Sequence, residues 1–112
     1  KYDSVKATDL QAQLHTADKP TVIDIRNGEM FGDMHIAGSV NIPEEELPER
    51  LAELPKDREA PLVMVCNIGK FSNRSVLYLK SLGYRNVRSM KGGLNEWVRK
   101  GHSTESTQVS AP

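Results

Sequence analysis

Short β-type runs alternate with helix-type patterns along this chain, and that alternation constrains the fold more than any other feature. The runs cover residues 21–25, 62–66 and 86–89, and each precedes a candidate helix. Strands that alternate with helices are typical of α/β domains with a mostly parallel sheet. Because 112 residues suffice for one such domain, the sequence predicts an α/β fold with a small, mostly parallel central sheet flanked by helices.

Capping residues and helix breakers predict where the helices lie. Thr8 and Ser72 are the expected N-caps of two helices, and Pro43 is expected to begin a helix between them. The last helix is expected over residues 94–100, with Trp97 facing the core.

The end of the chain lacks this periodicity. Residues 102–112 are polar and without a helix or strand pattern, so they are expected to form a disordered tail. The predicted domain therefore covers residues 1–101.

Charge and cysteine content exclude several classes of function. Lys plus Arg and Asp plus Glu number 15 each, so the net charge is zero, and neither nucleic acid nor a membrane is an expected partner. No apolar stretch approaches the roughly 20 residues of a transmembrane helix. The single cysteine excludes an internal disulfide, and a free thiol suits a reducing compartment, so a cytoplasmic location is expected.

Cys66 is the candidate nucleophile. It ends the apolar run 62–66, and Gly69 gives the loop after it the backbone freedom to turn around an anion. In an open α/β sheet, ligands bind beyond the carboxyl ends of the strands. Loop amides and the following helix N-terminus would then favour thiolate at Cys66. The alternative is a buried, inert cysteine at a strand end.

Other polar residues are expected to support this site. Asp24 lies within an apolar strand and needs a partner, so it is expected to accept hydrogen bonds that tie down a loop. Arg26 is expected to pair with Glu29 at the surface, or else to line the mouth of the site. His35 is expected to bond backbone, and no cluster with ligand spacing predicts a metal or other cofactor.

Three ordered motifs make the chain resemble a single rhodanese domain. The first pairs VIDIR with HIAGSVNIP, similar to the family's Asp-x-Arg and His-Ile-x-Gly-Ala-x-Asn-Ile-Pro patterns. The second is CNIG at residues 66–69, and the third combines LGY with KGGLNEW. The likeness runs from about residue 4 to residue 101, and it implies a three-layer rhodanese-like fold.

The resemblance implies a sulfurtransferase without a cofactor. Cys66 would take a sulfane sulfur from a donor, such as thiosulfate or a partner's persulfide, and pass it to a thiol, cyanide or protein acceptor. The loop that would bind the sulfur consists of Asn67, Ile68, Gly69, Lys70, Phe71 and Ser72, with Asp24 and Arg26 in support.

The sequence departs from the family within this loop. Many members carry an arginine where this chain has Phe71, and uninterrupted spacing places Arg74 in the first turn of the next helix instead. Lys70 is then the cation within the loop and is expected to attract anionic donors. Met30 replaces a common acid and Met34 a common glycine, which leaves the donor open.

Two alternatives belong to other classes. A phosphatase or arsenate reductase would need the pattern Cys-x5-Arg, whereas the sixth residue after Cys66 is Ser72. The second alternative is a rhodanese domain that serves as an interaction or sulfur-relay module of a larger protein.

Overall fold

The computed structural model describes residues 3–107 and shows an α/β domain with a five-stranded parallel sheet. The strands are β1 (Ser4–Lys6), β2 (Thr21–Asp24), β3 (Val40–Asn41), β4 (Leu62–Val65) and β5 (Val87–Lys91). The α-helices are α1 (Ala7–Gln13), α2 (Gly28–Asp33), α3 (Lys70–Ser81) and α4 (Gly93–Arg99), and two 3-10 helices are η1 (Glu44–Glu49) and η2 (Leu51–Glu53).

The sheet has the strand order β1-β5-β4-β2-β3, so β4 lies at its centre. Met64 of β4 pairs in register with Ile23 of β2 on one side and Ser89 of β5 on the other. Because all pairs are parallel, the carboxyl ends of β2, β4 and β5 meet at the same edge. The residues that follow these strands are thereby brought together.

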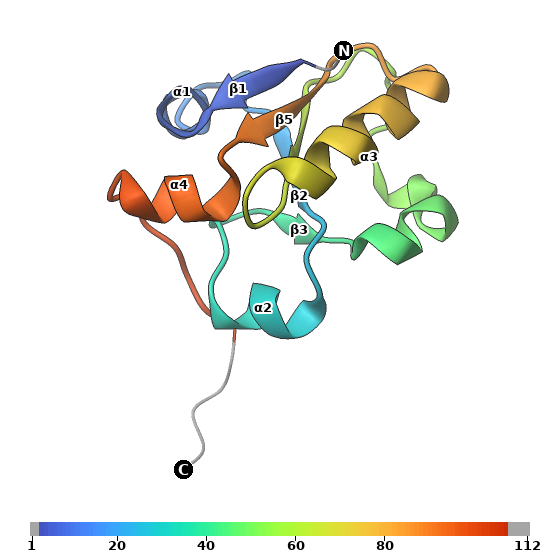
Figure 1. The fold of residues 1–112 in the computed structure, drawn as a ribbon. Helices are drawn as coiled ribbons and strands as arrows, with labels where there is room; N and C mark the ends of the chain where they lie inside the picture. The colour runs from blue at the N-terminus through green and yellow to red at the C-terminus, as the bar shows by residue number, and fades with distance from the viewer. Residues whose placement is uncertain (1–2, 108–112) are drawn as a thin grey trace.

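Helices cover both faces of the sheet, which gives three layers (Figure 1). Strand β4 shows the cause, because its side chains alternate between the faces and all four are buried. Leu62 and Met64 pack with α3 and the 3-10 segments, whereas Val63 and Val65 pack with α1 and α4. The predicted α/β class and three-layer architecture are confirmed.

Several predicted boundaries differ from the structure. The segment after Pro43 forms η1 and η2 rather than one α-helix, because Pro48 lies inside it and lacks the N–H that an α-helix requires. The N-cap of α1 is Lys6 rather than Thr8. The last helix, Gly93–Arg99, begins one residue earlier than expected, and Trp97 is buried as predicted.

Residues 102–107 differ from the tail expected at the end of the chain. Ser103 accepts a hydrogen bond from Nε1 of Trp97 at 2.9 Å, and Glu105 exchanges two backbone hydrogen bonds of 2.9 Å with His35. The backbone N–H of Thr107 donates to Gly32 O at 3.1 Å. This part of the expected tail therefore packs on the domain, while residues 108–112 lie outside the described residues.

Candidate functional site

The sulfur of Cys66 lies directly after β4, buried among hydrogen-bond donors. Its Sγ accepts hydrogen bonds from the backbone N–H of Gly69 at 3.0 Å and of Ser72 at 3.4 Å. The Oγ of Ser72 lies 3.3 Å from the same sulfur. Cys66 is 2% exposed and forms no disulfide. Three polar groups thus converge on the thiol at the expected edge of the sheet.

The loop around the sulfur turns at Gly69. Its φ of +88° lies in the left-handed region, which residues other than glycine rarely adopt. The predicted need for glycine at this position is therefore confirmed. Helix α3 begins at Lys70 with Gly69 as its N-cap, so the prediction that Ser72 caps this helix is wrong. Ser72 is instead the third residue of α3, and its N–H faces the sulfur because the first turn of a helix leaves such groups unpaired.

A second hydroxyl extends the group behind the sulfur. Ser89 of β5 is fully buried, and its Oγ lies 2.7 Å from the Oγ of Ser72. Ser89 is a site residue that was not predicted from the sequence. The position of Ser89 within its strand could have indicated this role. Side chains in a strand alternate with a period of two, so Ser89 lies on the same face of β5 as Val87, toward α3.

The start of α4 holds the loop from behind. The backbone N–H groups of Leu94 and Asn95 donate to the carbonyl oxygens of Cys66 and Asn67, at 2.8 and 3.0 Å. Gly93, with a φ of +63°, allows this approach: a Cβ there would lie 2.4 Å from the carbonyl carbon and oxygen of Asn67. The loop and α4 therefore meet backbone to backbone.

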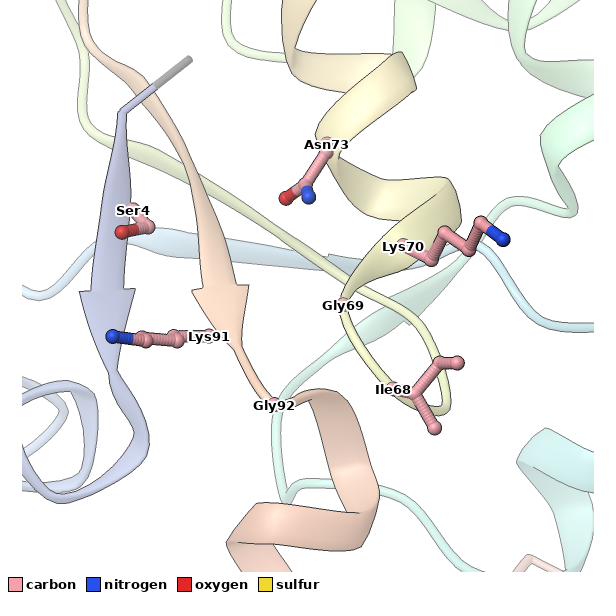
Figure 2. Close-up of a pocket in the computed structure, with 7 residues that line it drawn as sticks. All are labelled: Ser4, Ile68, Gly69, Lys70, Asn73, Lys91 and Gly92. Carbon is pink, nitrogen blue, oxygen red and sulfur yellow. The ribbon is translucent and has the colours of Figure 1, made fainter. Parts of the chain in front are cut away.

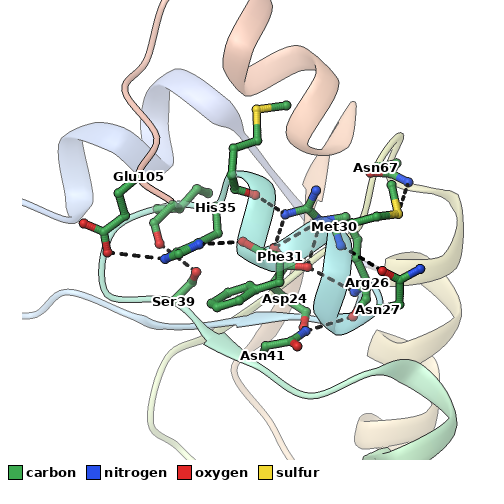
Figure 3. A network of polar contacts seen from close by, with 12 residues as sticks. Asp24, Arg26, Asn27, Met30, Phe31, His35, Ser39, Asn41, Asn67 and Glu105 are labelled. Carbon is green, nitrogen blue, oxygen red and sulfur yellow. Dashed lines mark hydrogen bonds and ion pairs between the residues drawn. The ribbon is translucent and has the colours of Figure 1, made fainter. Parts of the chain in front are cut away.

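Asp24 and Arg26 form a buried ion pair beside the site (Figure 3). Arg26 Nη2 donates to Asp24 Oδ2 at 2.8 Å and to the carbonyl oxygen of Met34 at 2.6 Å. The expected surface pair of Arg26 with Glu29 is therefore wrong, because Arg26 is buried next to Asp24. The need of Asp24 for a partner is confirmed, and the pair ties β2 to the end of α2.

His35 is held by backbone, as predicted. Its Nδ1 donates to Phe31 O at 2.7 Å, its ring stacks on that of Phe31, and Nε2 lies 3.3 Å from Oε1 of Glu105 (Figure 3). His35 thereby joins α2 to the residues that follow α4, away from the sulfur.

Phe71 occupies the rim of the loop and is 51% exposed. The guanidinium of Arg74 lies 4.9 Å from the centre of its ring and pairs with Glu44 at 2.6 Å. The hydrogen bonds that Arg74 donates to Glu44 raise the pKa of Arg74 above its ordinary value. Arg74 is the fifth residue of α3 rather than part of its first turn, so it faces Glu44 and not the sulfur.

Two open clefts flank the loop. One, of about 540 Å³, lies between β1, the end of β5 and the start of α3 (Figure 2). Lys91 points across it toward β1, whereas the side chain of Lys70 extends away on the far side. The other, of about 320 Å³, is lined by residues that include Arg26, Met30 and Asn67.

Two further features concern residues 3–107 alone. In this range the structure contains no group of three or more His, Cys, Asp or Glu side chains that could hold a metal ion. Within the same residues, no helix combines the length and apolar character needed to cross a membrane.

The rhodanese-like domain model matches residues 6–100 of this chain. The chain belongs to the rhodanese-like family. Among rhodanese-like proteins, thiosulfate sulfurtransferase GlpE of Shewanella oneidensis is 35% identical over 85 residues, which cover 76% of this chain and 82% of GlpE. The crystal structure of a rhodanese-related protein from Thermoplasma volcanium is 31% identical, with a TM-score of 0.83, and the match covers 93% of this chain and 98% of that one.

One similar protein is much longer than this rhodanese-like chain. Adenylyltransferase and sulfurtransferase uba4 of Ogataea parapolymorpha is 33% identical over 88 residues, which cover 79% of this chain and 22% of uba4. Several shorter relatives are named thiosulfate sulfurtransferase. The prediction of a thiosulfate sulfurtransferase-like enzyme of the rhodanese family is confirmed.

Proposed function

We propose that this rhodanese-like chain moves a sulfane sulfur from an anionic donor of the thiosulfate type, through a persulfide on Cys66, to a nucleophilic acceptor. The observation that carries the proposal is the convergence of the N–H groups of Gly69 and Ser72 on Sγ of Cys66. Donors held around a buried sulfur favour its anionic form, which is the nucleophile.

The proposed cycle has two balanced steps. In the first, the Cys66 thiolate attacks the outer sulfur of thiosulfate, a bond forms between Sγ and that sulfur, and sulfite leaves with the electron pair of the broken S–S bond. In the second, a nucleophile such as cyanide or a thiolate attacks the terminal sulfur of the persulfide. Cys66 then leaves as thiolate, so the cycle needs no second thiol and no resident cofactor.

The loop from Asn67 to Ser72 is the proposed sulfur-binding element. After the first step, negative charge moves from Sγ to the terminal sulfur, one bond further out. The amides of Asn67, Ile68, Lys70 and Phe71 are the remaining loop donors that we assign to that sulfur, in the manner of an oxyanion hole. Lys70 is proposed to attract the anionic donor, since its exposed ammonium stands at the start of α3.

Asp24 and Arg26 are proposed as supporting residues that act through the backbone. Their ion pair holds the carbonyl of Met34, and the cleft beside the loop is lined by Arg26, Met30 and Asn67. A fixed wall on this side would keep the donor aligned with the sulfur.

A sulfur relay between proteins is the second form of this proposal, in which a partner's persulfide is the donor or another protein is the acceptor. The likeness to uba4 supports it, because the matched segment is 22% of a longer protein that is named both adenylyltransferase and sulfurtransferase. Since a free thiol suits a reducing compartment, a cytoplasmic location stays a prediction.

Intact-protein mass spectrometry tests the cycle directly. The native chain and Cys66→Ser are incubated with thiosulfate, and their masses are measured before and after cyanide is added. We expect the native chain to gain one sulfur atom, to lose it to cyanide as thiocyanate, and Cys66→Ser to gain none.

The same spectra separate the alternatives. If thiosulfate leaves the native mass unchanged but a protein persulfide adds one sulfur to Cys66, the relay form holds. If no donor of either kind modifies Cys66, the proposed transfer is wrong.

A further inference from the structure

Ser89 lies behind the reactive sulfur, separated from it by a single side chain. Its Oγ is 2.7 Å from the Oγ of Ser72, and that atom is 3.3 Å from Sγ of Cys66. Ser72 and Ser89 are both 0% exposed, so neither hydroxyl can turn to bulk water. In the part of the chain that the structure describes, the Ser89 hydroxyl makes its hydrogen bond to Ser72 alone.

Cys66 Sγ, Ser72 Oγ and Ser89 Oγ form a row of three groups joined by two contacts. The number of hydrogens in this row depends on whether Cys66 is a thiol or a thiolate. When Cys66 is a thiol, the row holds three hydrogens, on Sγ and on the two hydroxyls, but it contains only two contacts. In the structure Sγ of Cys66 donates to Oγ of Ser72, the contact between the two hydroxyls uses a second hydrogen, and the third finds no acceptor among these three groups. A buried donor without a partner is costly, so the row disfavours the thiol.

The thiolate removes this mismatch. Once the proton of Cys66 has passed to solvent, Ser89 donates to Ser72 and Ser72 donates to the sulfur, so each remaining hydrogen has an acceptor. Charge-assisted hydrogen bonds of this kind are stronger than neutral ones. The N–H groups of Gly69 and Ser72, at 3.0 and 3.4 Å from the same sulfur, are further donors to it.

We propose that Ser89 is a positioning residue, which orients the Ser72 hydroxyl toward Cys66 and so favours the thiolate. The inference rests on the proposed role of Cys66 as the nucleophile. Ser89 does not touch the sulfur, and its effect passes through the one hydroxyl that does.

The ultraviolet absorbance of the thiolate, recorded against pH, tests this role. Because Cys66 is the only cysteine in the chain, the spectrum of Cys66→Ser supplies the background. We expect Ser89→Ala to move the thiolate profile to higher pH, so that on its rising limb the ratio of thiolate to thiol falls about tenfold.

Ser75→Ala is the matched control. Ser75 is also a buried serine, and its hydroxyl donates to the backbone oxygen of Ser72 at 2.8 Å without contacting the sulfur. Its removal should leave the thiolate profile in place. If Ser75→Ala moves the profile as far as Ser89→Ala does, the effect is loosened packing and the proposal is wrong.

Two further variants keep the test decisive. If Ser89→Ala does not fold, Ser89→Thr retains the hydroxyl and should keep the native profile, whereas a shift as large as tenfold would overturn the proposal. In a chain that already carries Ser72→Ala, the change Ser89→Ala should have no further effect, because the link to the sulfur is gone.

The absorbance measurement needs no sulfur donor, so it is independent of the transfer assay. A chain that transfers sulfur, but whose thiolate profile is the same with and without Ser89, refutes the role of Ser89 alone. A profile that depends on Ser89 in a chain that accepts no sulfur refutes the transfer and leaves the role of Ser89 standing.

Discussion

Gly93 allows the closest backbone approach at the site, and Gly93→Ala tests whether that approach shapes the loop. A Cβ at this position would lie 2.4 Å from the carbonyl carbon of Asn67 and 2.5 Å from the backbone nitrogen of Ile68. Both atoms belong to the backbone, so no side chain can turn aside to make room. Either α4 or the loop after Cys66 has to move.

Backbone strain and steric overlap both lower the stability of the domain when Gly93 is replaced by alanine. A φ of +63° costs an alanine about 1–2 kcal/mol relative to glycine, and overpacking a close contact costs about 1–3 kcal/mol more. The sum of about 2–5 kcal/mol is a large part of the roughly 5–15 kcal/mol that stabilises a typical domain. We therefore expect Gly93→Ala to be severely destabilised.

Gly101→Ala is the matched control for the backbone cost. Its φ is +80°, but a Cβ there meets no atom within 4 Å, so only the first cost of about 1–2 kcal/mol applies. Urea unfolding followed by circular dichroism measures the free energy of unfolding of both variants. If Gly93→Ala loses no more stability than Gly101→Ala, the backbone contact is not rigid and this reasoning is refuted.

The remaining predictions concern two ion pairs. Asp24→Asn leaves the Arg26 guanidinium buried without its anion, so urea unfolding should show that the free energy of unfolding falls by about 3–5 kcal/mol. Glu53→Gln, which breaks an exposed pair with Arg50, is the control. If Asp24→Asn lowers the free energy of unfolding as little as this control does, the structural role of the buried pair is contradicted. The hydrogen bond from Arg99 lowers the pKa of Glu96 below its ordinary value of 4.5, so the contribution of this pair to stability is complete above that value and lost as the pH falls through the lower one. The difference in unfolding free energy between the native chain and Glu96→Gln should therefore be larger at neutral pH than in acid, and equal differences would show that the pair is broken in solution.

The parts of the fold that the sequence predicted are those with a strong repeating pattern. β4 and its place before a helix follow from a run of apolar residues. β1 and β3 were not predicted, since three and two residues are too short to show a period. The prediction of an α-helix after Pro43 was wrong for a local reason, because Pro48 has no backbone N–H to donate in an α-helix.

The same limit applies to the site. Cys66 and Gly69 could be located because strand end, thiol and glycine follow one another in the sequence. The roles of Ser72 and Arg26 depend on tertiary contacts: Ser72 meets Ser89, seventeen residues away, and Arg26 is buried against Met34. Sequence rules for caps and surface pairs treat such side chains as exposed, and these two are buried.

The contact between Gly93 and the loop also determines when, during synthesis of the chain, the loop after Cys66 can form its hydrogen bonds. The loop after Cys66 is complete in sequence by residue 72, yet its carbonyl oxygens find their partners only when Leu94 and Asn95 have joined the fold. During synthesis, therefore, a chain that has not yet added α4 carries its single thiol in an unsupported loop. The proposed reactivity toward sulfur donors would thus appear only after the last helix of this domain has docked.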